Sequence, residues 1–212
     1  MYLTEAKEIA GTIGYPSKMP GTSYGLPAKA CITGGKLAKI EGTPCNKCYA
    51  MRGNYLYENV EKAQAKRLAG IYHPHWVDAL VLLLDDAHRR AIPHYHRWHD
   101  SGDIQSIPHL KNICKVAELT PKLMHWLPTQ EGAMLKDFLK EGVKVPENLT
   151  IRLSTPIIDG KSSRSWWYTS SVFKDDTKGY GHICPAKQQD NKCGNCRACW
   201  DKSVSHVSYH LH

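Results

Sequence analysis

The sequence predicts an α/β protein in which parallel strands alternate with helices. Strand-like runs at 94–99, 123–127 and 149–153 each end in a polar loop, and the first two loops lead into segments with helical spacing. This rhythm is typical of βαβ units, whose strands are parallel. The 212 residues, 42% of them hydrophobic, suffice for one such domain. Periodicity also allows a small open sheet, but we expect a partial or reduced TIM-like barrel of parallel βα units.

The N-terminal half is expected to supply one strand and two helices. Residues 23–30 form the first expected strand, which ends at Cys31. Apolar side chains at helical spacing then predict a helix over 58–69, and a glycine follows it as a stop signal. A second helix is expected over 73–90, because its apolar stripe continues until a proline breaks the pattern.

The next part of the chain repeats strand and helix. Residues 94–99 alternate weakly between polar and apolar and predict a strand, and residues 106–119 predict a helix. Cys114 lies on the apolar side of that helix, so we expect it to be a buried core thiol. Further elements are a strand at 123–127, a helix at 131–140 and a strand at 149–153.

Two later segments follow other patterns. Residues 157–181 are rich in Gly, Ser, Lys and Asp, which predicts a lid or a tether. The tail has too little apolar content for a core of its own, and its four cysteines are expected to compensate. We therefore divide the chain into an α/β iron–sulfur domain, 1–181, and a cysteine-rich C-terminal extension, 182–212, packed on it. The last residues are expected to form a strand beside the first.

Hydrophobicity and cysteine usage indicate the compartment. No apolar run approaches membrane length, and the start M-Y-L-T-E-A-K-E lacks the pattern of a secretory signal. We therefore expect a cytoplasmic protein that does not bind a membrane. In a reducing compartment, close-spaced C-x-x-C pairs bind metals or perform redox chemistry more often than they form disulfides.

An early cysteine group is the expected functional centre. The stretch C-I-T-G-G-K-L-A-K-I-E-G-T-P-C-N-K-C-Y-A contains Cys31, Cys45 and Cys48. A C-x-x-C pair places two thiolates on one metal centre, and two glycines let the loop fold back so that Cys31 supplies a third. A four-iron cluster usually takes four thiolates. Three would therefore leave one iron open to a small molecule.

A second cysteine group lies in the tail, in the pattern C-x8-C-x2-C-x2-C. Overlapping C-x2-C-x2-C is typical of chains that wrap four-iron clusters, whereas zinc fingers usually separate two C-x2-C pairs by a longer spacer. We expect a second metal centre, with an iron–sulfur cluster favoured and zinc as the alternative. A purely structural role stays open for either metal. The expected ligands are Cys184, Cys193, Cys196 and Cys199.

Polar residues follow the expected strands. In parallel sheets the carboxyl ends of the strands form the ligand crevice, so these residues are expected to share one cofactor and substrate site. A glycine there would let the backbone approach a ligand, and the aspartates would accept hydrogen bonds from an amine or a ribose. Each residue alone is equally consistent with ordinary loop polarity or a helix cap. The assigned residues are Arg97, Asp100, Ser101, Gly102, Asp103, Arg152 and Ser154.

The formal net charge of +8 allows two interpretations. A basic chain often binds nucleic acid or an acidic partner. Lys and Arg beside the cysteines would also offset the negative charge of a thiolate-bound cluster. No basic run or RNA-binding signature accompanies the charge, so nucleic acid stays an open partner.

Several stretches resemble one bacteriophage protein family, known by a numbered gene product, eighty-eight. They are G-K-L-A-K-I-E-G-T-P-C-N-K-C-Y-A, R-W-H-D-S-G-D-I, W-L-P-T-Q, L-T-I-R-L-S-T-P and C-G-N-C-R-A-C-W. The resemblance covers nearly the whole chain and implies a phage origin, and hence the cytoplasm of an infected host cell. It implies no activity.

A second resemblance is to radical S-adenosylmethionine enzymes, which hold a four-iron cluster with three cysteines after the first barrel strand. Cys31, Cys45 and Cys48 match that role, and D-S-G-D is similar in place to the loop that holds the methionine amine. The first gap is thirteen residues rather than three, and Tyr49 follows the last cysteine rather than preceding it. The resemblance implies S-adenosylmethionine as cofactor and an enzyme of unknown substrate. The alternative hypothesis is a non-catalytic, metal-stapled module that binds nucleic acid or a host protein.

Overall fold

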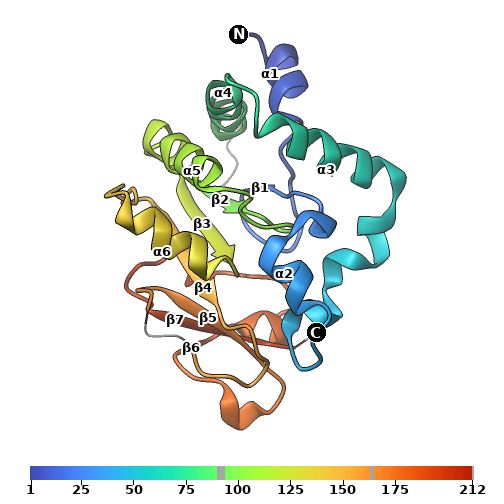
Figure 1. Ribbon diagram of the computed structural model, residues 1–212, viewed down its shortest axis with the longest axis vertical. Helices are drawn as coiled ribbons and strands as arrows, with labels where there is room; N and C mark the ends of the chain where they lie inside the picture. The colour runs from blue at the N-terminus through green and yellow to red at the C-terminus, as the bar shows by residue number, and fades with distance from the viewer. Residues whose placement is uncertain (90–93, 163–164, 212) are drawn as a thin grey trace.

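The computed structural model describes residues 1–89, 94–162 and 165–211, and it confirms the α/β class. Seven strands form one sheet in the order β1-β2-β3-β4-β5-β7-β6, and every neighbouring pair is parallel (Figure 1). Among the described residues, the edge strands β1 and β6 each pair with a single strand. The sheet is therefore open, and the expected closure into a barrel does not occur.

Most predicted elements lie where the sequence places them. The strands are β1 Thr22–Tyr24, β2 Tyr95–Trp98, β3 Met124–Thr129, β4 Leu149–Ser154, β5 Thr169–Phe173, β6 His182–Ile183 and β7 His206–His210. The α-helices are α1 Leu3–Ala10, α2 Ile32–Leu37, α3 Glu58–Gly70, α4 Trp76–Arg89, α5 Ile107–Leu119 and α6 Gly132–Lys140. The expected end of the second helix at residue 90 lies outside the described residues. None of the described helices is long and apolar enough to cross a membrane.

Two late segments differ from expectation. Residues 157–181 contain β5, which pairs with β4 and β7 in the interior of the sheet, so they are not simply a lid or tether. The last strand, β7, lies between β5 and β6 and not beside β1. The tail is thus part of the same sheet. Its β6 and β7 pair with each other, and the segment between them carries all four tail cysteines.

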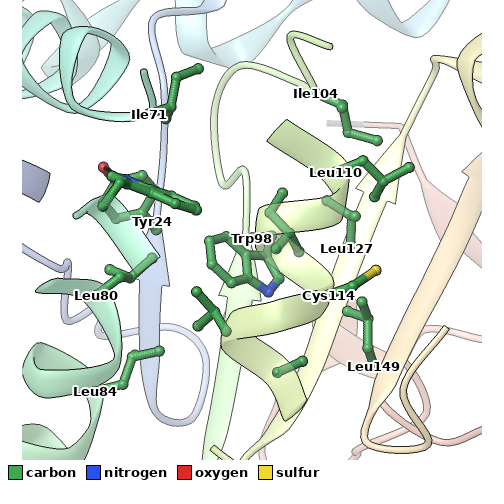
Figure 2. Packing of buried hydrophobic residues seen from close by; sticks show 14 of the residues in the cluster. Tyr24, Ile71, Leu80, Leu84, Trp98, Ile104, Leu110, Cys114, Leu127 and Leu149 are labelled. Atoms are coloured by element: carbon green, nitrogen blue, oxygen red, sulfur yellow. Dashed lines mark hydrogen bonds between the residues drawn. The ribbon is translucent and has the colours of Figure 1, made fainter. Parts of the chain in front are cut away.

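One face of the sheet packs against α4, α5 and α6, and this is where the main core lies. Alternate strand residues point into it, because successive side chains of a strand face opposite sides. Figure 2 shows Trp98 between Tyr24 and Leu80 on one side and Leu110 and Leu127 on the other. The rings of Tyr24 and Trp98 meet edge to face at 6.1 Å. Cys114 is 2% exposed in this core, as predicted.

The opposite face, here called the tail-covered face, packs against the cysteine-rich tail. Trp126 of β3 and Val207 of β7 form a second apolar cluster with Trp200 of the tail. The Trp200 indole donates to the His96 carbonyl at 2.9 Å, which fixes the tail to β2. In a closed barrel, inward-facing side chains would fill the space on one face of the sheet. In this open sheet the tail covers that face instead.

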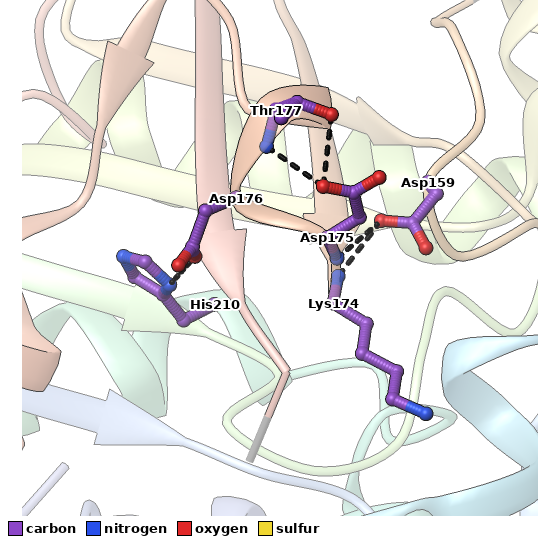
Figure 3. A network of polar contacts seen from close by, with 6 residues as sticks. All are labelled: Asp159, Lys174, Asp175, Asp176, Thr177 and His210. Atoms are coloured by element: carbon purple, nitrogen blue, oxygen red, sulfur yellow. Dashed lines mark hydrogen bonds and ion pairs between the residues drawn. The ribbon is translucent and has the colours of Figure 1, made fainter.

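A polar turn fixes the segment after β4 against the end of β5 (Figure 3). Asp159 has a positive φ of 62°, and its Oδ1 accepts from the backbone N–H groups of Lys174 at 2.8 Å and Asp175 at 3.2 Å. His210 of β7 lies 3.6 Å from the Asp176 carboxylate. These contacts give the polar β5–β6 connection a defined course beside β7.

Buried His125 gives the fold a pH dependence. Its Nδ1 accepts from the Trp98 indole at 3.2 Å, and its Nε2 donates to Thr120 Oγ1 at 2.9 Å, since Thr120 itself donates to the Val116 carbonyl. Burial lowers the pKa of His125 to about 3. Below pH 6.5 the unfolded chain therefore binds a proton that the folded chain does not.

We expect this histidine alone to lower the free energy of unfolding by about 1.4 kcal/mol per pH unit between pH 6 and pH 4. Urea unfolding curves measured across that range test this for wild type and His125→Gln. The variant is expected to show a shallower loss of stability with falling pH. Equal slopes for the two proteins would contradict the assignment.

Candidate metal centre

The first three cysteines lie on two short elements after β1. Cys31 immediately precedes α2, and Cys45 lies in the 3-10 turn Pro44–Lys47. Thr43 begins that turn, because its Oγ1 accepts from the Asn46 N–H at 3.2 Å. The Cys48 N–H donates to the Cys45 carbonyl at 3.2 Å, and this hydrogen bond closes the tight turn of the C-x-x-C pair.

The sulfurs of these cysteines converge. Cys31 Sγ and Cys45 Sγ each lie 3.6 Å from the point that a Cβ on Gly34 would occupy, so both sulfurs lie beside this glycine. Burial raises the pKa of the Cys31 thiol to about 12, and Asp103, Cys48 and Cys45 add to the rise. Burial raises the pKa of the Cys45 thiol to about 11, and the nearby Cys48 thiol contributes to the rise. The structure therefore brings together the trio that the sequence singled out.

Two carboxyl groups from the neighbouring strand ends face this trio. Asp103 follows β2, Glu131 follows β3, and both act electrostatically on the Cys31 and Cys45 sulfurs. Burial raises the pKa of Asp103 to about 7 even though three donors oppose the rise. The cysteine group therefore lies at the carboxyl edge of the sheet, the edge at which parallel folds bind ligands.

Three residues of the D-S-G-D loop contact their own chain. Asp103 Oδ1 accepts from Thr129 Oγ1 at 2.6 Å, and Ser101 Oγ donates to the Leu26 carbonyl at 2.7 Å. Gly102 has φ +77°, and a Cβ there would lie 2.6 Å from Leu26 Cβ. The close backbone approach at Gly102 is thus to the end of β1, which positions the strand preceding Cys31.

Asp100 and Arg97 retain unpaired polar atoms beside the trio. The backbone carbonyl of Asp100 accepts from the Tyr49 hydroxyl, and its Oδ2 accepts from Tyr55 at 3.4 Å. Asp100 Oδ1 and Arg97 Nε are buried without a hydrogen-bond partner among the described residues. Arg97 Nη2 donates to the Tyr49 hydroxyl at 3.2 Å, and its guanidinium lies 4.6 Å from the Trp126 ring centroid.

Arg152 and Ser154 lie on the tail-covered face of β4. The guanidinium of Arg152 is fully buried and donates to backbone carbonyls of the tail. Ser154 Oγ lies 3.2 Å from Ser170 Oγ of β5. Both residues therefore contact the chain beneath the tail rather than the trio.

The four tail cysteines form a second group. Electrostatic contacts link Cys184 to Cys193, Cys196 and Cys199. Burial raises the pKa of Cys199 to about 12, opposed by a contact of 3.1 Å between its sulfur and the Tyr209 hydroxyl. Arg97 acts electrostatically on Cys193 and also contacts Tyr49, the residue after Cys48.

The spacing of the donors bears on the kind of metal they suit. All eight cysteines are free thiols. Among the described residues, no three His, Cys, Asp or Glu side chains are close enough to hold a single metal ion. A zinc ion needs every sulfur about 2.3 Å away, whereas a four-iron cluster spreads its ligand sulfurs over several irons. As the structure arranges them, the described residues of neither cysteine group therefore meet the geometry of a single-ion site.

Sequence reasoning missed three residues near the cysteines. Glu131 contacts the cysteine segment, Tyr49 contacts Arg97, and His182 Nε2 lies 3.3 Å from Cys196 Sγ. Glu131 directly follows W-L-P-T-Q, so the same strand-end signal would have found it. Tyr49 and His182 each lie within two residues of a cysteine, which is a weaker signal.

Comparison with known proteins gives a family. The model of the family described as Gene product 88 matches residues 2–202, and these include both cysteine groups and all the strands except β7. Neither a curated protein nor a solved structure gives a significant match to this chain. The chain therefore belongs to the Gene product 88 family.

Proposed function

We propose that this protein is an iron–sulfur enzyme of the radical S-adenosylmethionine type, with Cys31, Cys45 and Cys48 holding a [4Fe–4S] cluster. The observation that carries the proposal is the convergence of these sulfurs at the carboxyl edge of a parallel sheet. Cys31 Sγ and Cys45 Sγ both lie 3.6 Å from the position of a Cβ on Gly34, and Cys48 acts electrostatically on both thiols. Because the chain offers three thiols there, one iron would lack a protein ligand.

Held by Cys31, Cys45 and Cys48, a cluster reduced by an external donor would supply the one-electron reduction that cleaves S-adenosylmethionine. The chain would hold the cofactor and orient it. Among the residues assigned to this role, Asp100 is the best candidate to accept from the cofactor amine, because its Oδ1 has no partner among the described residues. Ser101, Gly102 and Asp103 would set the shape of the loop.

The tail quartet is proposed as a second metal centre. Its thiols are arranged around Cys184, and the tail around them is packed on the sheet through Trp200. The overlapping C-x2-C-x2-C pattern supports an iron–sulfur cluster over zinc here. A substrate would then meet Arg97, which contacts Tyr49 next to Cys48 and acts electrostatically on Cys193.

Anaerobic purification followed by iron, sulfide and zinc analysis tests the metal. Reduction with dithionite and addition of S-adenosylmethionine then tests the reaction, with 5′-deoxyadenosine as the expected product. A brown, iron-loaded protein that forms none would contradict the enzyme. Colourless protein with stoichiometric zinc would contradict the clusters. Steeply salt-dependent binding to RNA or DNA without turnover would support the non-catalytic module instead.

A further inference from the structure

We propose that Glu131 is a positioning residue that fixes Cys31 through Thr33 and sets the electrostatic environment of the cluster. This inference rests on the proposed function of the trio. Glu131 is 4% exposed and lies between β3 and α6. Its Oε1 accepts from the Thr33 N–H and its Oε2 from the Thr33 hydroxyl, both at 2.7 Å.

Glu131 and Thr33 lie 98 positions apart in the sequence, so the contact between them is tertiary. Thr33 lies in the first turn of α2, two residues after Cys31. Both carboxylate oxygens of Glu131 are engaged by this one residue, a two-point contact that restricts rotation as well as distance. Movement of Glu131 would therefore move the backbone that carries Cys31.

Glu131 is itself anchored across the sheet edge. Its N–H donates to Thr129 Oγ1 at 3.0 Å, and Thr129 Oγ1 donates to Asp103 Oδ1 at 2.6 Å. Asp103 also accepts from the backbone N–H groups of Gln130 and Ile104, each at 2.8 Å. The loops after β1, β2 and β3 are thus joined in one hydrogen-bonded chain that ends next to Cys31.

The charge of Glu131 adds a second effect. The carboxylate acts electrostatically on the Cys31 and Cys45 sulfurs, the two that lie beside Gly34. A negative charge beside a cluster disfavours the uptake of an electron, and hydrogen bonds and charges around the sulfurs are known levers on reduction potential. Glu131 is therefore expected to keep the potential of the trio's cluster low.

Two pairs of variants separate position from charge. Glu131→Gln keeps the length of the side chain and its capacity to bond Thr33 but removes the charge, whereas Glu131→Ala removes both. Thr33→Val removes the hydroxyl donor at nearly constant volume, and Thr33→Ser retains it. Glu118→Gln, on an exposed position of α5, is the control for the loss of a carboxylate elsewhere.

The measurements are iron release to a chelator under anaerobic conditions and the midpoint potential from a titration followed by electron paramagnetic resonance. We expect roughly 10- to 100-fold faster iron release from Glu131→Ala, a smaller increase from Thr33→Val, and the wild-type rate from Thr33→Ser and Glu118→Gln. Glu131→Gln is expected to retain its iron but to shift the potential to a more positive value.

The outcomes distinguish this inference from the function on which it rests. Wild-type protein without iron would overturn the proposed function. The positioning role alone would be overturned by a different result. In that case the wild type is loaded with iron, and Glu131→Gln, Thr33→Val and Glu131→Ala all keep the wild-type rate of iron release and the wild-type potential. Lower thermal stability with an unchanged potential in Glu131→Gln would also count against it, because a merely structural residue would behave in that way.

Discussion

Replacing Arg152 with methionine is expected to lower the free energy of unfolding by roughly 3–5 kcal/mol. The guanidinium donates to four tail carbonyls, those of Ala198, Cys199, Asp201 and Val204, at 2.7–3.0 Å. Methionine fills similar volume and relieves the cost of burying a charge. The carbonyls of Ala198 and Asp201 would keep a backbone donor, from Asp201 and Val204 respectively. Those of Cys199 and Val204 would lose the donor that Arg152 supplies, and an unsatisfied buried acceptor costs about 1–3 kcal/mol. The loss of donors is the larger effect.

Urea unfolding measures this change, and limited proteolysis shows where it acts. The tail is expected to be cut first in the variant, because Arg152 connects β4 to it. Arg89→Met is the matched control, since Arg89 is exposed on α4 and its pairing with Asp86 contributes about 1 kcal/mol or less. Equal stability of Arg152→Met and Arg89→Met would refute the role of this buried arginine.

Replacing Cys31 with alanine is expected to remove about half of the bound iron, from about eight ions per chain to about four. A cluster held by two thiolates would be lost, while the tail quartet would remain complete. Cys199→Ala should remove the other half. Cys114→Ala is the control, because this thiol is 2% exposed in the core, among apolar side chains of the helix-packed face.

Iron analysis after anaerobic reconstitution and desalting measures these losses. Wild-type iron in Cys31→Ala together with complete loss in Cys199→Ala would mean that the chain holds one cluster, in the tail. Loss of all iron in both variants, with unchanged folding by circular dichroism, would mean that the two groups load as one unit. The second result would also contradict two independent centres.

Local patterns were enough to predict helices α3 to α6, but not the short helix α2, which lies within the expected cysteine loop. The helices at 58–70 and 107–119 follow from apolar spacing and from Ser106, whose Oγ accepts from the His109 N–H at 3.2 Å. The spacing of the cysteines also grouped Cys31, Cys45 and Cys48, and in the structure Cys45 and Cys48 act electrostatically on Cys31. The residues that define a helix lie close together in the sequence. Closely spaced cysteines are informative because, in a reducing compartment, they rarely form disulfides.

Strand β5 could not be predicted, because its burial depends on a distant partner. T-S-S-V-F shows no clear alternation, yet Thr169 and Ser171 are buried and their hydroxyls lie 2.8 Å and 3.0 Å from the two ring nitrogens of His206 on β7. Polar residues in a buried strand are stable only when such partners exist. Glu131 was missed for the same reason, since its partner Thr33 is far away in the sequence.

The position of β7 between two earlier strands sets an order of assembly. As the chain emerges from the ribosome, β1 to β5 can join in sequence, because each finds its neighbour already made. Strand β6 cannot join at that stage, since among the described strands it pairs with β7 alone. The cysteines at 184, 193, 196 and 199 are therefore synthesised before β7, and a metal centre built on them can be enclosed only after that strand has been made.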